Sequence, residues 1–183
     1  MRDISLHILD LMENAVRAQA TLIALRIEVD QAKDMLRIVI EDNGRGLEMP
    51  PEEAVDPFRT TKPGKKTGLG LSLFKAAVER ADGTMALRRS DLGGLAVDAS
   101  MRWSHVDRSP LGDIAETVSG ILCAAPRIKL ECRFSCDLRR REVLSADVQR
   151  RIENGSDLAL AAAVADEVRA ALRDLNILDE SFN

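Results

Sequence analysis

Apolar residues recur at the start of the chain with the spacing of a helix that buries one face. The positions lie three or four residues apart: Ile4, Ile8, Leu11, Ala15 and Ala18. Residues at this spacing fall on the same side of an α-helix, because one turn takes about 3.6 residues. The pattern predicts a helix over residues 3–19.

Two hydrophobic runs follow and predict an antiparallel hairpin. Residues 21–30 and 35–41 are rich in Ile, Leu and Val, alternate in part with polar residues, and are separated by a short polar link. Turn-forming residues at 42–46 end the second run. Residues 49–67 hold several prolines among polar residues, which predicts a long loop that can include one short helix.

The pattern then becomes helical again over residues 69–81, and the helix is expected to stop at Asp82-Gly83. The strand-like runs 84–89 and 95–101 flank a turn at residues 90–94 and predict a second hairpin.

The pattern of apolar and polar residues changes after Pro110. Helices are predicted over residues 111–125, 146–153 and 157–175, and a strand over 127–136. The three arginines 139–141 are followed at once by an acidic residue and predict a solvated loop. We place a boundary near residues 104–110, which gives an N-terminal domain of residues 1–105 and a smaller α+β appendage of residues 106–183.

Composition limits the classes of partner. The chain has 183 residues, with 26 Lys plus Arg against 30 Asp plus Glu, so its formal net charge is −4. An acidic balance gives no general attraction for phosphodiester backbones, so we expect no nucleic-acid partner. No apolar stretch is long enough to span a membrane, and we expect a soluble cytoplasmic protein without a membrane partner.

Three cysteines are too few, and odd in number, for a disulfide framework. Cys132 and Cys136 would lie on the same face of a strand. Two buried, reduced thiols explain this spacing better than half of a metal site does.

The first predicted helix also carries a polar face. On a helical wheel His7, Asp10, Asn14 and Arg17 fall within about 80° of each other. An amide oxygen can bind Mg²⁺, a guanidinium can pair with phosphate, and a carboxylate can accept a proton. Taken alone, the stripe is also what any amphipathic surface helix shows.

The turn at residues 42–46 offers a second candidate site. The carboxylate of Asp42 stands at a strand end and can accept a hydrogen bond from an exocyclic amine, while Gly44 and Gly46 let the backbone approach a flat ligand. The alternative is a tight turn capped by Asp42 and Asn43.

A third candidate precedes the helix at residue 69. Glycines ahead of a helix leave its first backbone N–H groups open to anions, and Lys62, Lys65 and Lys66 add positive charge. The segment matches neither the P-loop nor the dinucleotide fingerprint. A surface loop with solvated lysines is the alternative.

The order of these segments resembles the Bergerat-fold ATP-binding domain of the GHKL superfamily, which includes gyrase, MutL, sensor histidine kinases and anti-sigma protein kinases. Four segments resemble its boxes: residues 8–21 the N box, 41–47 the first glycine box, 56–62 the F box and 65–75 the second glycine box. The resemblance covers residues 4–101, a little over half of the chain.

The resemblance implies a two-layer α/β sandwich, with helices on one face of a mixed, mostly antiparallel sheet, and ATP and Mg²⁺ as ligands. It implies that Asn14 binds Mg²⁺, that Arg17 contacts phosphate and that Asp42 bonds the adenine amino group. Gly44 and Gly46 would shape the base pocket. A lid would close on the triphosphate with Lys62, Thr67, Gly68, Leu69, Gly70 and Leu71.

The sequence departs from the pattern of the superfamily at three places. Members that hydrolyse ATP or phosphorylate serine usually have Glu four residues before the metal-binding Asn, where this chain has Asp10. Lys66 replaces a glycine of the second glycine box, and Gly94-Leu95 replaces the Gly-Thr of many histidine kinases. Because Asp10 stands where the superfamily usually has this Glu, we assign the catalytic role to Asp10.

The resemblance favours a Mg²⁺-dependent ATP-binding protein of the histidine kinase-like class, acting as a protein-kinase-like or slow ATPase component. The alternative is a non-catalytic ATP-sensing module that presents its C-terminal appendage to a protein partner. A DNA-acting relative of mismatch-repair proteins is disfavoured by the acidic balance. We expect no histidine autokinase, because no dimerising helical hairpin precedes the N box, and we expect His7 to lie in the core or at the pocket edge.

Overall fold

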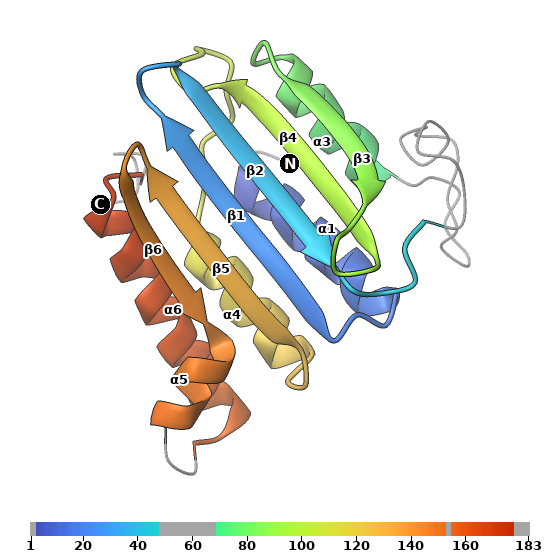
Figure 1. Ribbon diagram of the computed structural model, residues 1–183, viewed down its shortest axis with the longest axis vertical. Helices are drawn as coiled ribbons and strands as arrows, with labels where there is room; N and C mark the ends of the chain where they lie inside the picture. The colour runs from blue at the N-terminus through green and yellow to red at the C-terminus, as the bar shows by residue number, and fades with distance from the viewer. Residues whose placement is uncertain (1–2, 48–68, 153–154, 178–183) are drawn as a thin grey trace.

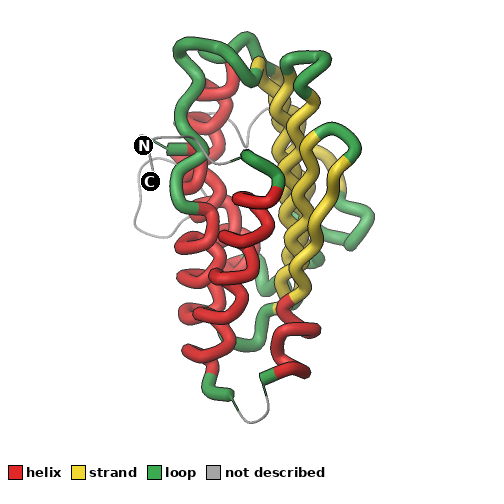
Figure 2. Tube along the Cα trace, turned by 90° about the vertical axis from the view of Figure 1, so that its left-hand side faces the viewer, coloured by secondary structure: helices red, strands yellow, loops and turns green. Residues whose placement is uncertain are grey.

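In the described part of the chain, the six strands form one sheet, and the long helices pack on one of its faces (Figure 1). The computed structural model describes residues 3–47, 69–152 and 155–177. Figure 2 shows the two layers edge-on, with the long helices in one layer and the strands in the other. The two-layer sandwich expected from the sequence is confirmed.

The elements follow one another in the order α1 (Ile4–Arg17), β1 (Leu22–Asp30), β2 (Met35–Asp42), α3 (Leu69–Glu79), β3 (Thr84–Arg89), β4 (Leu95–Arg102), α4 (Ile114–Ala124), β5 (Lys129–Cys136), β6 (Arg139–Leu144), α5 (Ser145–Arg151) and α6 (Asp157–Asp174). Both predicted hairpins are confirmed, as are the predicted helices that lie in the described ranges. The loop expected over residues 49–67 lies outside the described residues.

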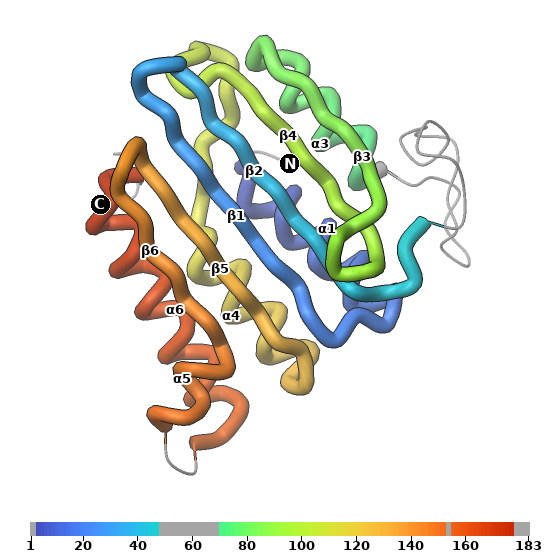
Figure 3. Tube along the Cα trace, viewed as in Figure 1, coloured from blue at the N-terminus to red at the C-terminus, as the bar shows by residue number. Residues whose placement is uncertain are grey.

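The strand order in the sheet is β3-β4-β2-β1-β5-β6. All neighbouring strands are antiparallel except β1 and β5, which run parallel. The sheet is therefore mixed and mostly antiparallel, as expected. In Figure 3 the blue β1 and the orange β5 lie side by side although they are far apart in the chain.

Strand alternation explains why one face of the sheet is covered. In β1 the side chains of Ile23, Leu25 and Ile27 are fully buried, whereas Arg26 and Glu28 alternate with them. Successive side chains of a strand point to opposite faces, so the apolar set packs against the helices and the charged set faces away from them. The apolar stripe of α1 joins the same core.

The second half of the chain extends this sheet. Strand β5 pairs with β1, and α4 packs against α1 in the helix layer. The backbone N–H groups of Ile4 and Ser5 donate to the carbonyls of Pro110 (2.9 Å) and Leu111 (2.8 Å), which satisfies donors at the start of α1. The boundary placed near residues 104–110 falls on the connection between β4 and α4. The division into two domains stays a prediction.

The solvated loop predicted at residues 139–141 is wrong, because these arginines begin strand β6. Arg139 donates to the carbonyl oxygens of Asp174 (2.9 Å) and Leu175 (3.0 Å) at the end of α6. Positive charge is favourable there, because the last carbonyls of a helix lack partners within it. The arginines are exposed along an edge strand, where charge also discourages pairing with other chains.

The prediction for the cysteine pair is confirmed. Cys132 and Cys136 both lie on β5 and both are buried free thiols. Burial raises the pKa of the Cys132 thiol to about 12, so this group is inert at neutral pH. In the described part of the chain, no helix has the length and apolar character needed to cross a membrane.

Candidate functional site

The polar side chains of α1 form a connected ladder along one helix face. Asn14 Nδ2 donates to Asp10 Oδ2 at 3.2 Å, and Arg17 Nη2 donates to Asn14 Oδ1 at 2.5 Å. Arg17 also pairs with Glu13 Oε2 at 3.2 Å. Residues three and four positions apart are neighbours on a helix surface, which places the predicted acid, amide and base together.

The carboxylate of Asp42 lies at the end of β2 and is almost completely buried. Its Oδ1 accepts hydrogen bonds from the backbone N–H of Gly44 (2.7 Å) and of Leu95 (3.4 Å). Burial raises the pKa of Asp42, and the two N–H donors oppose this effect. The site thus holds a desolvated carboxylate whose direction is fixed by backbone donors.

The turn after Asp42 touches the C-terminal end of α1. The N–H of Arg45 donates to the Ala18 carbonyl at 3.0 Å, and a Cβ at Gly44 would lie 2.7 Å from the same oxygen. Only glycine fits at residue 44 without displacing the helix end. Asp42, the residue predicted to contact adenine, and the polar ladder of α1 therefore lie on segments that contact each other.

Asn43 has a structural role in this turn. Its side-chain oxygen accepts from the backbone N–H of Thr21 (2.8 Å) and Leu22 (2.9 Å), and its amide nitrogen donates to Thr21 Oγ1 (2.9 Å). These bonds fasten the start of β1 to the turn after β2.

The hairpin between β3 and β4 closes over Asp42 from the other side. The N–H of Gly94 donates to the Asp42 carbonyl at 3.0 Å. Gly46, which has a φ of +74°, faces Gly94 across the turn. Gly94 and Leu95 are not among the residues predicted for the site, although a glycine pair at a hairpin is a signal of close backbone approach.

The start of α3 meets the polar ladder at Asp10. Leu69, Gly70 and Leu71 form the first turn of α3, and a Cβ at Gly70 would lie 1.7 Å from Asp10 Oδ2. The second glycine box thus contacts the N box directly. Three more residues predicted to bind the ligand lie outside the described residues: Lys62, Thr67 and Gly68.

His7 lies in the core between α1 and α3. Its ring centroid is 5.3 Å from that of Phe74, and its side chain is buried. Among the described residues, neither imidazole nitrogen has a hydrogen-bond partner. Burial lowers the pKa of His7 to about 4, and the positive charge of Arg80 adds to the effect. Of the two locations expected for His7, the structure shows the core.

A hollow of about 750 Å³ lies elsewhere, between the start of β1, the turn before β5, and helices α5 and α6. Its walls include Thr21, Arg127, Lys129 and Gln149, and no predicted site residue.

Comparison with known proteins shows which protein family the chain resembles. The family described as histidine kinase-, DNA gyrase B- and HSP90-like ATPases matches residues 2–104. A Rickettsia bellii protein named as an NtrY-like sensor histidine kinase is 31% identical over 78 residues, which are 41% of this chain and 12% of that protein. The chain thus spans a small part of the length of that relative.

Two solved structures resemble the fold. The N-terminal domain of a DNA repair protein has a TM-score of 0.48 and 12% identity, covering 90% of this chain and 57% of that one. The Aquifex aeolicus MutL ATPase domain complexed with ADP has a TM-score of 0.47 and 14% identity, covering 91% of this chain and 70% of that one. Because the family match spans more than half of the sequence, this chain belongs to the histidine kinase-, DNA gyrase B- and HSP90-like ATPase family.

Proposed function

We propose that the chain uses Mg²⁺ and ATP for phosphoryl transfer, as a protein-kinase-like or slow ATPase component. The observation that carries this proposal is the meeting of three segments: the turn after Asp42 contacts the end of α1, and the start of α3 contacts Asp10. Each segment supplies one part of a nucleotide site.

The base would bind at Asp42. This carboxylate is buried and already oriented by two backbone N–H groups on Oδ1, so Oδ2 is the oxygen that we assign to the amino group of adenine. Gly44 and Gly94 let the backbone approach this carboxylate closely, because an added Cβ would lie 3.0 Å from Oδ1 at residue 44 and 2.1 Å from it at residue 94. A hydrogen bond to a charged acceptor contributes about 1.5–3 kcal/mol.

The phosphate chain would lie between α1 and the first turn of α3. Backbone N–H groups at a helix start attract anions, and Arg17 adds a guanidinium from the last turn of α1. Lys62, Thr67 and Gly68 would complete this region.

The side chain of Asn14 fits a magnesium ion. Its amide oxygen is of the type that Mg²⁺ takes together with phosphate and water oxygens. Arg17 donates to Asn14 Oδ1, so it must release this oxygen when the oxygen binds a metal, and its guanidinium then becomes available to phosphate. A bound Mg²⁺ would offset negative charge on the transferring phosphoryl group.

Asp10 is the residue that we assign to the chemical step. Its carboxylate stands against Gly70, where α1 and α3 meet, and it would accept the proton of the attacking water or hydroxyl. Lys62 would offset the charge that develops on the γ-phosphate.

A second candidate function is ATP sensing without turnover, with a protein partner bound by the second half of the chain. It is favoured by the direct bonds from Ile4 and Ser5 of α1 to residues 110 and 111, which join the ligand helix to that half. Ordering of a lid around ATP would then be read by the partner.

The test is a titration of ATP with and without Mg²⁺, followed by incubation with γ-labelled ATP. Label released to water supports an ATPase, and label transferred to protein supports a kinase. Tight binding without either result supports the sensing module. If ATP does not bind, both proposals are wrong.

A further inference from the structure

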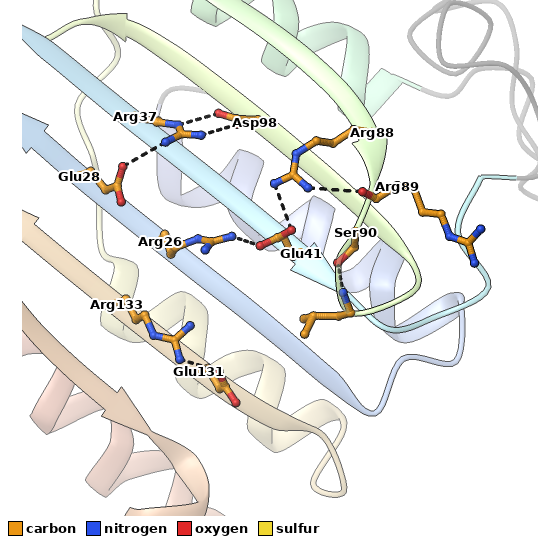
Figure 4. Close-up of polar contacts among 11 residues, drawn as sticks. Arg26, Glu28, Arg37, Glu41, Arg88, Arg89, Ser90, Asp98, Glu131 and Arg133 are labelled. Atoms are coloured by element: carbon orange, nitrogen blue, oxygen red, sulfur yellow. Dashed lines mark hydrogen bonds and ion pairs between the residues drawn. The ribbon is translucent and has the colours of Figure 1, made fainter.

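The face of the sheet turned away from the helices carries a network of arginines and carboxylates (Figure 4). One member, Glu41, precedes Asp42 directly on β2. Neighbouring residues of a strand point to opposite faces, so Glu41 lies on the outer face and Asp42 on the face of the candidate site.

Glu41 is the enclosed member of this network. It forms ion pairs with Arg26 of β1 and with Arg88 of β3, the latter at 3.1 Å, and only 6% of its side chain is exposed. Its cross-strand neighbours on either side are Ala24 and Ala96. Because Ala96 is small, Arg88, which lies opposite it on β3, can reach over β4 to the carboxylate, while Arg26 lies on the adjacent strand β1.

Arg88 connects Glu41 to the hairpin that closes over Asp42. Its Nη1 donates to the carbonyl of Arg89 at 3.3 Å, at the end of β3. The following residue, Ser90, donates its N–H to the Gly94 carbonyl at 2.9 Å, and this bond closes the hairpin. The same hairpin supplies the two backbone N–H groups, from residues 94 and 95, that bond Asp42.

The ion pairs of Glu41 therefore hold together, on the outer face, the strands that shape the site on the inner face. We propose that Glu41 is a positioning residue for base recognition: with Arg26 and Arg88 it fixes the end of β2 and the β3–β4 hairpin, so that the carboxylate of Asp42 points at the 6-amino group of adenine. This inference rests on the proposed function, in which Asp42 binds adenine.

Comparing the affinities for two nucleotides distinguishes a loss of Asp42 positioning from a general loss of stability. Purine riboside triphosphate is ATP without the 6-amino group, so the ratio of the two affinities measures the bond to Asp42 alone. We expect the wild-type protein to prefer ATP by about tenfold or more, as a bond to a charged acceptor implies. In Glu41→Gln the affinity for ATP should fall while that for purine riboside triphosphate holds, which moves the ratio towards one.

Two controls address other causes. Glu28→Gln removes a carboxylate of the same face that pairs with Arg37 at 3.5 Å on other strand positions, and it should keep the wild-type ratio. Val164→Ala leaves a gap in the core at α6, and it should lower the melting temperature without changing the ratio.

Arg88→Gln serves as the second test variant, because the Arg88 side chain is 40% exposed and its loss threatens folding less. It should lower the affinity ratio as Glu41→Gln does. Because the two residues form one ion pair, the variant with both substitutions should have the same ratio as either single variant. If both single variants keep the wild-type ratio, the positioning role is wrong and the proposed function stands. If the wild-type protein binds neither nucleotide, or binds both equally, the assignment of Asp42 itself is wrong.

Discussion

Gly94 lies so close to Asp42 that a Cβ at residue 94 would stand 2.1 Å from Oδ1 of the carboxylate. The hairpin and the strand end therefore fit together only while residue 94 lacks a side chain. The same contact fixes the direction of the buried carboxylate, because the N–H of Leu95 reaches the same oxygen.

Gly94→Ala should lower the affinity for ATP by about tenfold or more, and the free energy of unfolding by about 1–3 kcal/mol, because the hairpin or Asp42 must move. Gly120→Ala is the matched control, since Gly120 lies in α4 with nothing within 4 Å of the added Cβ. It should raise stability by about 0.5–1 kcal/mol and leave binding unchanged. Calorimetric titration and thermal melts measure both quantities. Equal binding by the two variants would show that residue 94 does not border the ligand.

Asp10→Asn should keep ATP binding and lower turnover by about 10²–10⁴-fold, because an amide cannot accept the proton. The change keeps the shape of the side chain and leaves an oxygen for the bond from Asn14. Glu13→Gln on the same helix pairs only at the surface with Arg17 and should keep full turnover. The measurement is release or transfer of γ-labelled phosphate. Full activity in Asp10→Asn would remove Asp10 from the chemical step.

Substitutions of Asn14 and Arg17 should differ in how they change the effect of Mg²⁺ on ATP affinity. Asn14→Ala removes the amide oxygen and should abolish most of the gain in ATP affinity that Mg²⁺ provides. Arg17→Ala should weaken ATP binding with Mg²⁺ and without it, because it removes a phosphate contact. ATP titrations in Mg²⁺ and in a chelator separate the two effects. If Asn14→Ala responds to Mg²⁺ as the wild-type protein does, the metal binds elsewhere.

His7 should make the protein less stable as the pH falls from 6.5 to 4. Its pKa is about 4 in the folded protein against 6.5 as the ordinary value, so the unfolded chain takes up the proton first. The loss is on the order of 3 kcal/mol once the pH is below 4. His7→Leu should flatten the dependence of unfolding free energy on pH within this range, as denaturant titrations at several pH values would measure.

Val164→Ala supplies the control, because it lowers stability through the core at α6 without removing a titratable group, and it should keep the wild-type slope. Asp34 acts at lower pH, because hydrogen bonds from Ser104 and Arg102 hold its pKa at about 2. A slope between pH 6.5 and 4 that survives His7→Leu would assign the effect to other groups.

Local patterns were sufficient to predict most elements of the fold. The hairpin of β1 and β2 follows from alternating apolar residues joined by a short link, and α1 from apolar steps of three and four. The partner of β5 was not predictable in this way, because alternation shows which face of a strand is buried but not which strand lies beside it. The strand at the arginines of β6 was not predictable, because an exposed edge strand and a solvated loop have the same polar composition.

The site was predictable where its parts lie on one element. Asp10, Asn14 and Arg17 share a helix face, and their hydrogen bonds confirm that placement, while their roles stay predictions. The contact of Gly70 with Asp10 and the closing of the hairpin on Asp42 depend on tertiary packing. The burial of Glu41 was likewise not predictable. Its neighbours Ala24 and Ala96 lie on the two strands beside β2, and the linear sequence does not show that they flank Glu41.

The parallel pairing of β1 with β5 has a consequence for synthesis of the protein. The partner of β1 on one side, β2, follows it directly in the chain, whereas its partner on the other side is residues 129–136, which the ribosome makes much later. An exposed apolar strand edge invites pairing with other chains, so the nascent protein passes through a period of aggregation risk that ends only when β5 emerges. Slowing translation within residues 106–136 should therefore lower the yield of native protein more than slowing it after residue 150.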